Sequence, residues 1–150
     1  MIINIVRLLY ALIVLSLWSQ SDVKTGKVHN VGLVLPVFFS ALFDPMLFVA
    51  TFVPVFVVLA SVYMAIRKRG LFGFADVIAI PFVLMHLIYL NIFGIMSFVG
   101  MFAYLMMYAN RVKYDKKLKR KIYNRIILMP ILLLSYFVGV LIHLVFFLLI

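Results

Sequence analysis

Long apolar runs separated by short polar segments make up this chain, and the pattern predicts helices. Apolar residues do not alternate with polar ones, as they would in the strands of a membrane β-barrel, but form unbroken runs of helix length. The predicted fold class is therefore all-α, with residues 1–150 forming a single domain. The runs cover 2–18, 28–66, 74–108 and 126–150.

Two of these runs are too long to cross a membrane only once. A helix rises about 1.5 Å per residue and the hydrocarbon core of a bilayer is about 30 Å thick, so about twenty residues cross once. The run 28–66 must fold back, and Asp44-Pro45 is a turn signal within it. Asn91 is the polar residue near the middle of 74–108. Breaks at these two positions predict a bundle of six transmembrane helices.

Composition and charge agree with a membrane protein. Hydrophobic residues make up 68% of the chain, whereas soluble domains are about half apolar. Six spans put the segments 20–30, 67–73 and 109–125 on one side, and thirteen of the fourteen Lys and Arg residues lie in them, Arg7 being the exception. The positive-inside rule makes that side cytoplasmic and the N-terminus external. The net charge of +10 then reflects membrane insertion, with no nucleic-acid partner, and we expect 111–125 to contact anionic membrane lipid.

Few side chains in this sequence are candidates for chemistry. The chain has no cysteine, which excludes disulfides and thiol catalysis, and its four acidic residues are all aspartates. Asp115 lies among eight cationic residues, which explains it as a solvated charge, and turn chemistry explains Asp44. His86 and His143 lack the spacing of metal ligands and are predicted to form hydrogen bonds between helices. We therefore expect no metal or cofactor.

Asp22 and Asp76 remain, and the six-span topology brings both to the cytoplasmic ends of spans. Asp22 is predicted just after the first span, and Asp76 just inside the fourth, where an apolar run follows it. An ionisable residue at such a depth is costly, so a functional role is the default hypothesis. The alternative for Asp76 is a helix N-cap. Two neighbouring carboxylates share a proton, and such a pair can activate a water and polarise a peptide carbonyl.

The sequence "GFAD", which runs from Gly73 to Asp76, resembles the GxGD signature of intramembrane aspartyl proteases. The segment "DVKTGKVHN", from Asp22 to Asn30, resembles the region after the first span of prepilin and preflagellin (archaellin) peptidases. The arrangement of spans, aspartates and basic loops extends this resemblance over the whole chain. The chain departs from the family pattern in having Ala75 at the second glycine of the signature. It also has Ile78 where many members have lysine, and a histidine at position 29 where many have proline.

The resemblance implies a membrane-embedded aspartyl endopeptidase with Asp22 and Asp76 as catalytic residues. Its substrates would be type IV pilin-like or archaellin precursor proteins, cleaved at the cytoplasmic face of the cell membrane to release a short basic leader. Gly73 would give the catalytic loop freedom. Asn30 is expected to be an N-cap of the second span, or to orient Asp22.

One further expectation and two alternative functions follow from the sequence. The paired cysteines of the bifunctional family members are missing, so we expect no N-methyltransferase activity. One alternative function is a noncatalytic membrane assembly factor with the same fold. Another is a small transporter that uses the two aspartates as an ion or proton relay.

Overall fold

The computed structural model describes residues 2–25, 30–66, 74–114 and 128–149. Within these ranges the chain is helical and contains no strand, which confirms the predicted all-α class. The helix bounds are α1 Ile2–Thr25, α2 Asn30–Phe43, α3 Pro45–Leu47, the π-helical turn η1 Phe48–Phe52, α4 Val53–Ile66, α5 Phe74–Leu87, α6 Ile92–Tyr114 and α7 Leu128–Leu149.

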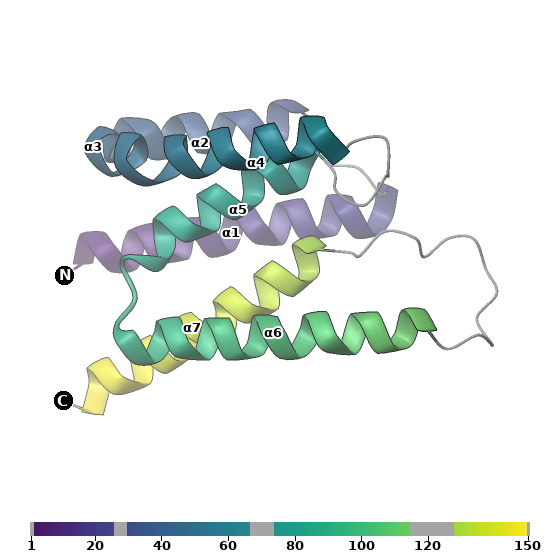
Figure 1. Cartoon of the computed structure of the whole chain (residues 1–150). Helices are drawn as coiled ribbons and strands as arrows, with labels where there is room; N and C mark the ends of the chain where they lie inside the picture. Colours follow the sequence, from purple (N-terminus) through teal and green to yellow (C-terminus); the bar gives the residue numbers. More distant parts are fainter. Residues whose placement is uncertain (1, 26–29, 67–73, 115–127, 150) are drawn as a thin grey trace.

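These helices form six rods, because α3, η1 and α4 follow one another without a break. Successive rods run in opposite directions along the bundle, and the two chain ends lie at the same end of it (Figure 1). Three rods are long enough and apolar enough to cross a membrane, over Ile3–Val23, Pro45–Ala65 and Leu128–Phe147. At 14 residues, α2 and α5 are each about 21 Å long, shorter than a bilayer core of about 30 Å. Six spans therefore remain a prediction.

Both predicted helix breaks are confirmed, and each has a polar cap. The side chain of Asp44 accepts a hydrogen bond from the Leu47 backbone N–H (3.1 Å), with Pro45 at the first helical position. At the second break, the Asn91 side-chain oxygen accepts from the Gly94 N–H at 2.8 Å. These caps satisfy N–H groups that would otherwise lack partners at the starts of α3 and α6.

Prolines explain two irregularities that the apolar pattern does not predict. Pro54 has no N–H to donate to the Ala50 carbonyl, and η1 widens the helix just before it, where its ring would clash with that carbonyl. Pro36 lies inside α2 and likewise leaves the Gly32 carbonyl without its usual partner in the helix. The indole N–H of Trp18 in α1 donates to this carbonyl at 2.7 Å.

Helix α5 is the most enclosed element of the bundle. It packs against α1, α2, α4 and α7. On the other side of the bundle, α6 and α7 approach closely at Gly94 and Gly139. A Cβ atom added to either glycine would lie 2.8–2.9 Å from the carbonyl oxygen of the other. The buried side chains of α5 are those of Val77, Ile78, Ala79, Pro81, Phe82, Val83, Met85, His86 and Leu87.

Candidate functional site

Asp22 lies inside α1, whereas the sequence predicted it just after the first span. The described helix continues past Trp18 to Thr25, because Ser19, Gln20 and Ser21 tolerate helix. Asp22 is half-buried and stands four residues after Trp18, on the same face of the helix. It therefore extends a stripe of buried α1 residues that includes Leu8, Ala11, Leu15 and Trp18.

Asp76 lies in the first turn of α5 and is also half-buried. The helix begins at Phe74, so Asp76 is its third residue and not its N-cap, which corrects the alternative explanation given for it. A carboxylate in a first turn is favoured by the helix dipole. This local stabilisation offsets part of the cost of holding a charge beside the buried run that starts at Val77.

Ring contacts show how α1 and α5 are aligned. The Tyr10 ring lies 6.2 Å from the His86 ring, and the Trp18 ring lies 5.0 Å from the Phe82 ring, so the two helices run antiparallel. Asp22 follows Trp18 by four residues, about 6 Å, and Asp76 precedes Phe82 by six residues, about 9 Å. Both displacements point the same way along the bundle. The last part of α1 and the first part of α5 lie at the same end of the bundle (Figure 1). Asp22 and Asp76 thus lie at nearly the same level.

Trp18 holds this part of α1 against two neighbours. Its N–H donates to the Gly32 carbonyl of α2, and its ring packs against Phe82 of α5 while being only 2% exposed. Because Asp22 is one helical turn away, the Trp18 contacts limit where its carboxylate can lie.

The other residues of the two motifs lie in different surroundings in the structure. Ile78, at the position where many family members have lysine, is 6% exposed and belongs to the core. Ala75 is half-buried against that core. Asn30 is the first described residue of α2, and its role as an N-cap stays a prediction because 26–29 lie outside the described residues. The predicted roles of Gly73 and of the basic segments 67–73 and 115–125 lie outside the described residues.

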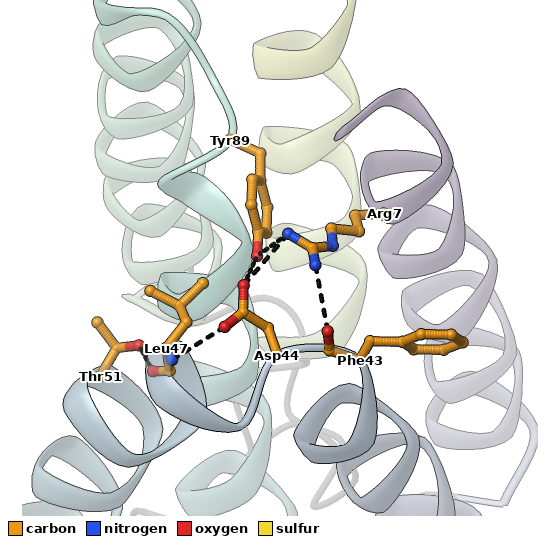
Figure 2. A network of polar contacts seen from close by, with 6 residues as sticks. All are labelled: Arg7, Phe43, Asp44, Leu47, Thr51 and Tyr89. Carbon is orange, nitrogen blue, oxygen red and sulfur yellow. Dashed lines mark hydrogen bonds and ion pairs between the residues drawn. The ribbon is translucent and has the colours of Figure 1, made fainter. Parts of the chain in front are cut away.

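A second polar site, not predicted from the sequence, lies at the opposite end of the bundle (Figure 2). The Arg7 guanidinium forms an ion pair with Asp44 at 3.2 Å and donates to the Tyr89 hydroxyl at 2.8 Å. It also donates to the Phe43 carbonyl at 3.2 Å. The Tyr89 hydroxyl in turn donates to Asp44 at 3.1 Å. We call Arg7, Asp44 and Tyr89, with the Phe43 carbonyl, the Arg7 network.

The Arg7 network brings together α1, the α2–α3 junction and the segment between α5 and α6. The Arg7 guanidinium carbon also lies 4.9 Å from the centre of the Tyr89 ring, a cation–π contact. The Tyr89 hydroxyl accepts from Arg7 and donates to Asp44, so it links the two charged groups. The turn role predicted for Asp44 is confirmed, and the ion pair is an additional role.

The two histidines inside the helices differ in their partners. His143 of α7 accepts from the Asn91 N–H at 3.0 Å, which confirms a hydrogen bond between helices. For His86 this prediction was wrong, because its Nδ1 bonds to the Phe82 carbonyl of its own helix at 2.8 Å. Among the residues that the structure describes, no group of three or more His, Cys, Asp or Glu side chains could hold a metal ion.

Two cavities border α1, one at the Arg7 network and one farther along the helix. A cavity of about 520 Å³ adjoins the Arg7 network, with Tyr10, Ser40 and His86 among its lining residues. An apolar groove of about 630 Å³ lies between α1 and α7, where Leu12, Ile13 and Leu17 face Leu133, Leu134 and Phe137. Leu17 is five residues before Asp22, so the groove lies on the same helix as this aspartate.

The arrangement places two carboxylates at one end of the antiparallel helices α1 and α5 and an ion pair at the other end. The first end has the groups needed for general acid–base chemistry. At the second end, the positive charge of Arg7 already has its counter-ion. No protein-family model, curated protein or solved structure matches this chain, so a functional assignment has to be argued from these residues.

Proposed function

We propose that this protein is a membrane-embedded aspartyl endopeptidase that removes the short basic leader from type IV pilin-like or archaellin precursors. In this proposal Asp22 and Asp76 act at the cytoplasmic face of the cell membrane, without a cofactor and without N-methyltransferase activity. The observation that carries the proposal is the alignment of α1 and α5. Two of the chain's four aspartates lie at one end of these packed antiparallel helices, at nearly one level.

The proposed chemistry uses one proton shared by two carboxylates. Like charges held close together do not both ionise readily, so one aspartate is ionised while the other stays protonated. The ionised carboxylate takes a proton from water as the water oxygen attacks the peptide carbonyl, and the protonated carboxyl donates a hydrogen bond to the carbonyl oxygen. The tetrahedral intermediate then loses the amine, which receives, as the C–N bond breaks, the proton that the first carboxylate took from the water.

The substrate class comes from the resemblance of the two motifs to the peptidase family, and an apolar groove between α1 and α7 is compatible with it. The groove beside α1 is apolar and suits the hydrophobic segment of a precursor lying in the membrane. The leader would then project toward Asp22 and Asp76. A helical peptide hides its carbonyls in hydrogen bonds, so the scissile bond must be locally extended, which a glycine before it makes easier.

A noncatalytic assembly factor is the second candidate, and Ile78 favours it. An apolar core residue occupies the position where many family members have lysine, and Ala75 replaces a signature glycine. A chain that kept the fold but lost the chemistry would tolerate both changes.

Cleavage of a precursor with a basic leader, by membranes that contain the protein, tests the proposal. We expect Asp22→Asn and Asp76→Asn each to slow cleavage by at least about a hundredfold, because asparagine cannot share the proton. Asp115→Asn, which removes a carboxylate outside both motifs, is the matched control and should cleave normally. Full activity of either Asp22→Asn or Asp76→Asn would refute the aspartyl pair. Failure of the unchanged protein to cleave any such precursor would favour the assembly factor or a transporter.

A further inference from the structure

The Arg7 network contacts both helices that contain the proposed catalytic aspartates, at the end farthest from those aspartates. Arg7 belongs to α1, fifteen residues before Asp22, which corresponds to about 22 Å along the helix. Tyr89 follows the last residue of α5 by two positions. Asp44 lies between them and bonds to both side chains. The network therefore joins the start of α1 to the end of α5.

Aromatic rings make part of the side-chain contact between α1 and α5. The ring pairs between these two helices involve Tyr10 or Trp18 on α1, with centroid distances of 5.0–6.3 Å. Apolar contacts of this kind are not directional, so they permit small sliding movements. Charge-assisted hydrogen bonds require short distances and defined angles. A slip of one residue between two helices changes the level by about 1.5 Å and turns the face by about 100°.

The cavity beside the network strengthens this argument. It has a volume of about 520 Å³ and is lined by all three network side chains. Surrounding side chains consequently do not fill all of the space around Arg7 and Tyr89. The polar contacts themselves hold these groups in place, with Arg7 and Asp44 only 23% and 27% exposed.

We propose that Arg7, Asp44 and Tyr89 are positioning residues that set the axial register of α1 against α5. The register set at this end decides how Asp22 and Asp76 face each other at the other end. This inference rests on the proposed function for its catalytic consequence. Its geometric part concerns only the relative placement of two helices and can be tested without any substrate.

The geometric test uses cysteine cross-linking, which is clean because the chain has no cysteine of its own. Cysteines replace both aspartates, as Asp22→Cys with Asp76→Cys, and a short bifunctional thiol reagent is added to membranes. The control pair is Phe93→Cys with Phe146→Cys, whose rings stack at 4.3 Å between α6 and α7. Adding Arg7→Met should reduce cross-linking of the first pair severalfold and leave the control pair unchanged.

Every other cross-linking result contradicts the proposal. If Asp22→Cys and Asp76→Cys do not cross-link in the protein that keeps Arg7, the two positions are not held together. An unchanged yield after Arg7→Met would mean that the register does not depend on the network. An equal loss in both pairs would mean that Arg7 supports the whole bundle and not the alignment of α1 with α5.

The catalytic consequence is tested with the cleavage assay. A misplacement of about 1 Å can cost about a hundredfold in rate, so we expect a loss of that order for Arg7→Met. Arg7→Lys keeps the charge and should recover part of both cleavage and cross-linking. Tyr89→Phe should also slow cleavage, whereas the matched control Tyr104→Phe, at a side chain 64% exposed on α6, should not.

The two proposals fail in distinguishable ways. If the unchanged protein cleaves precursors and Arg7→Met cleaves them equally well, the positioning role is wrong and the peptidase remains. If the unchanged protein cleaves none, the proposed function is wrong. The cross-linking yield then decides alone whether the Arg7 network sets the register.

Discussion

The carboxyl group of Asp44 takes part in two interactions, and two different substitutions can distinguish their contributions to stability. It caps α3 through Leu47 and forms the ion pair with Arg7. Asp44→Asn keeps an oxygen for the cap but removes the charge, so we expect a loss of about 1–2 kcal/mol. Asp44→Ala also removes the cap and should cost about 1 kcal/mol more. Thermal unfolding in detergent micelles shows which of the two variants is less stable. Equal melting temperatures for Asp44→Asn and Asp44→Ala would argue against the cap.

Trp18 and Pro36 form a second pair of residues whose effects should depend on each other. Pro36 leaves the Gly32 carbonyl free, and Trp18 donates to it. Trp18→Phe would leave this carbonyl without a partner, at a cost of about 1–3 kcal/mol. In a Pro36→Ala background, the new N–H at position 36 can bond to Gly32, so the same Trp18→Phe change should cost less.

A double-mutant cycle on thermal unfolding measures this dependence. The four proteins are the unchanged chain, each single variant and the double variant. Additive effects would mean that the carbonyl of Gly32 does not need the indole N–H. The melting temperatures then would report only the lost packing of the larger Trp18 ring.

Between elements, the contact of α6 with α7 depends on two small residues. A Cβ at Gly94 would lie 2.8 Å from the Gly139 carbonyl oxygen, so the helices must separate to admit alanine. We expect Gly94→Ala and Gly139→Ala each to destabilise the fold by about 1–3 kcal/mol. Gly100→Ala is the matched control on α6, because nothing lies within 4 Å of its added Cβ. It should be neutral or stabilise by up to about 1 kcal/mol.

The helix breaks could be predicted from the sequence because their signals are local. Asp44-Pro45 and Asn91 each cap the next helix with their own side chains. The end of α1 was predicted seven residues too early, since the polar residues after Trp18 were taken as a helix end although none of them breaks a helix. The turn η1 was missed because the clash that it relieves depends on Pro54 within one continuous rod.

The sequence predicts at which end of the bundle a site residue lies, because this depends on the order of the helices. It does not predict which side chains meet there, because this depends on packing. Alternating helices are enough to bring Asp22 and Asp76 to one end. The same logic could have found the ion pair, because Arg7 is the one base and Asp44 the one acid assigned to the opposite side. Tyr89 could not be predicted, because none of the eight tyrosines has a distinguishing neighbour in the sequence.

For the whole molecule, the number of spans can be tested by placing single cysteines at both ends of the rods. Six spans with an external N-terminus put Met46 and Ile92 outside, and Val23 and Met64 inside. These four side chains are well exposed, at 84%, 66%, 62% and 67%. A membrane-impermeant maleimide added to intact cells should therefore label Met46→Cys and Ile92→Cys. It should label Val23→Cys and Met64→Cys only after the cells are opened.

The position of Met46 relative to Met64 decides between six spans and three. If only α1, the Pro45–Ala65 rod and α7 crossed the bilayer, Met46 would lie on the same side as Val23, and Met64 on the opposite side. Val57→Cys is the control, because its side chain is 55% exposed in the middle of that rod and would face lipid in either case. It should stay unlabelled, since maleimide needs a hydrated thiolate. Labelling of Met64→Cys but not Met46→Cys in intact cells would overturn the six-span topology, and with it the cytoplasmic placement of Asp22 and Asp76.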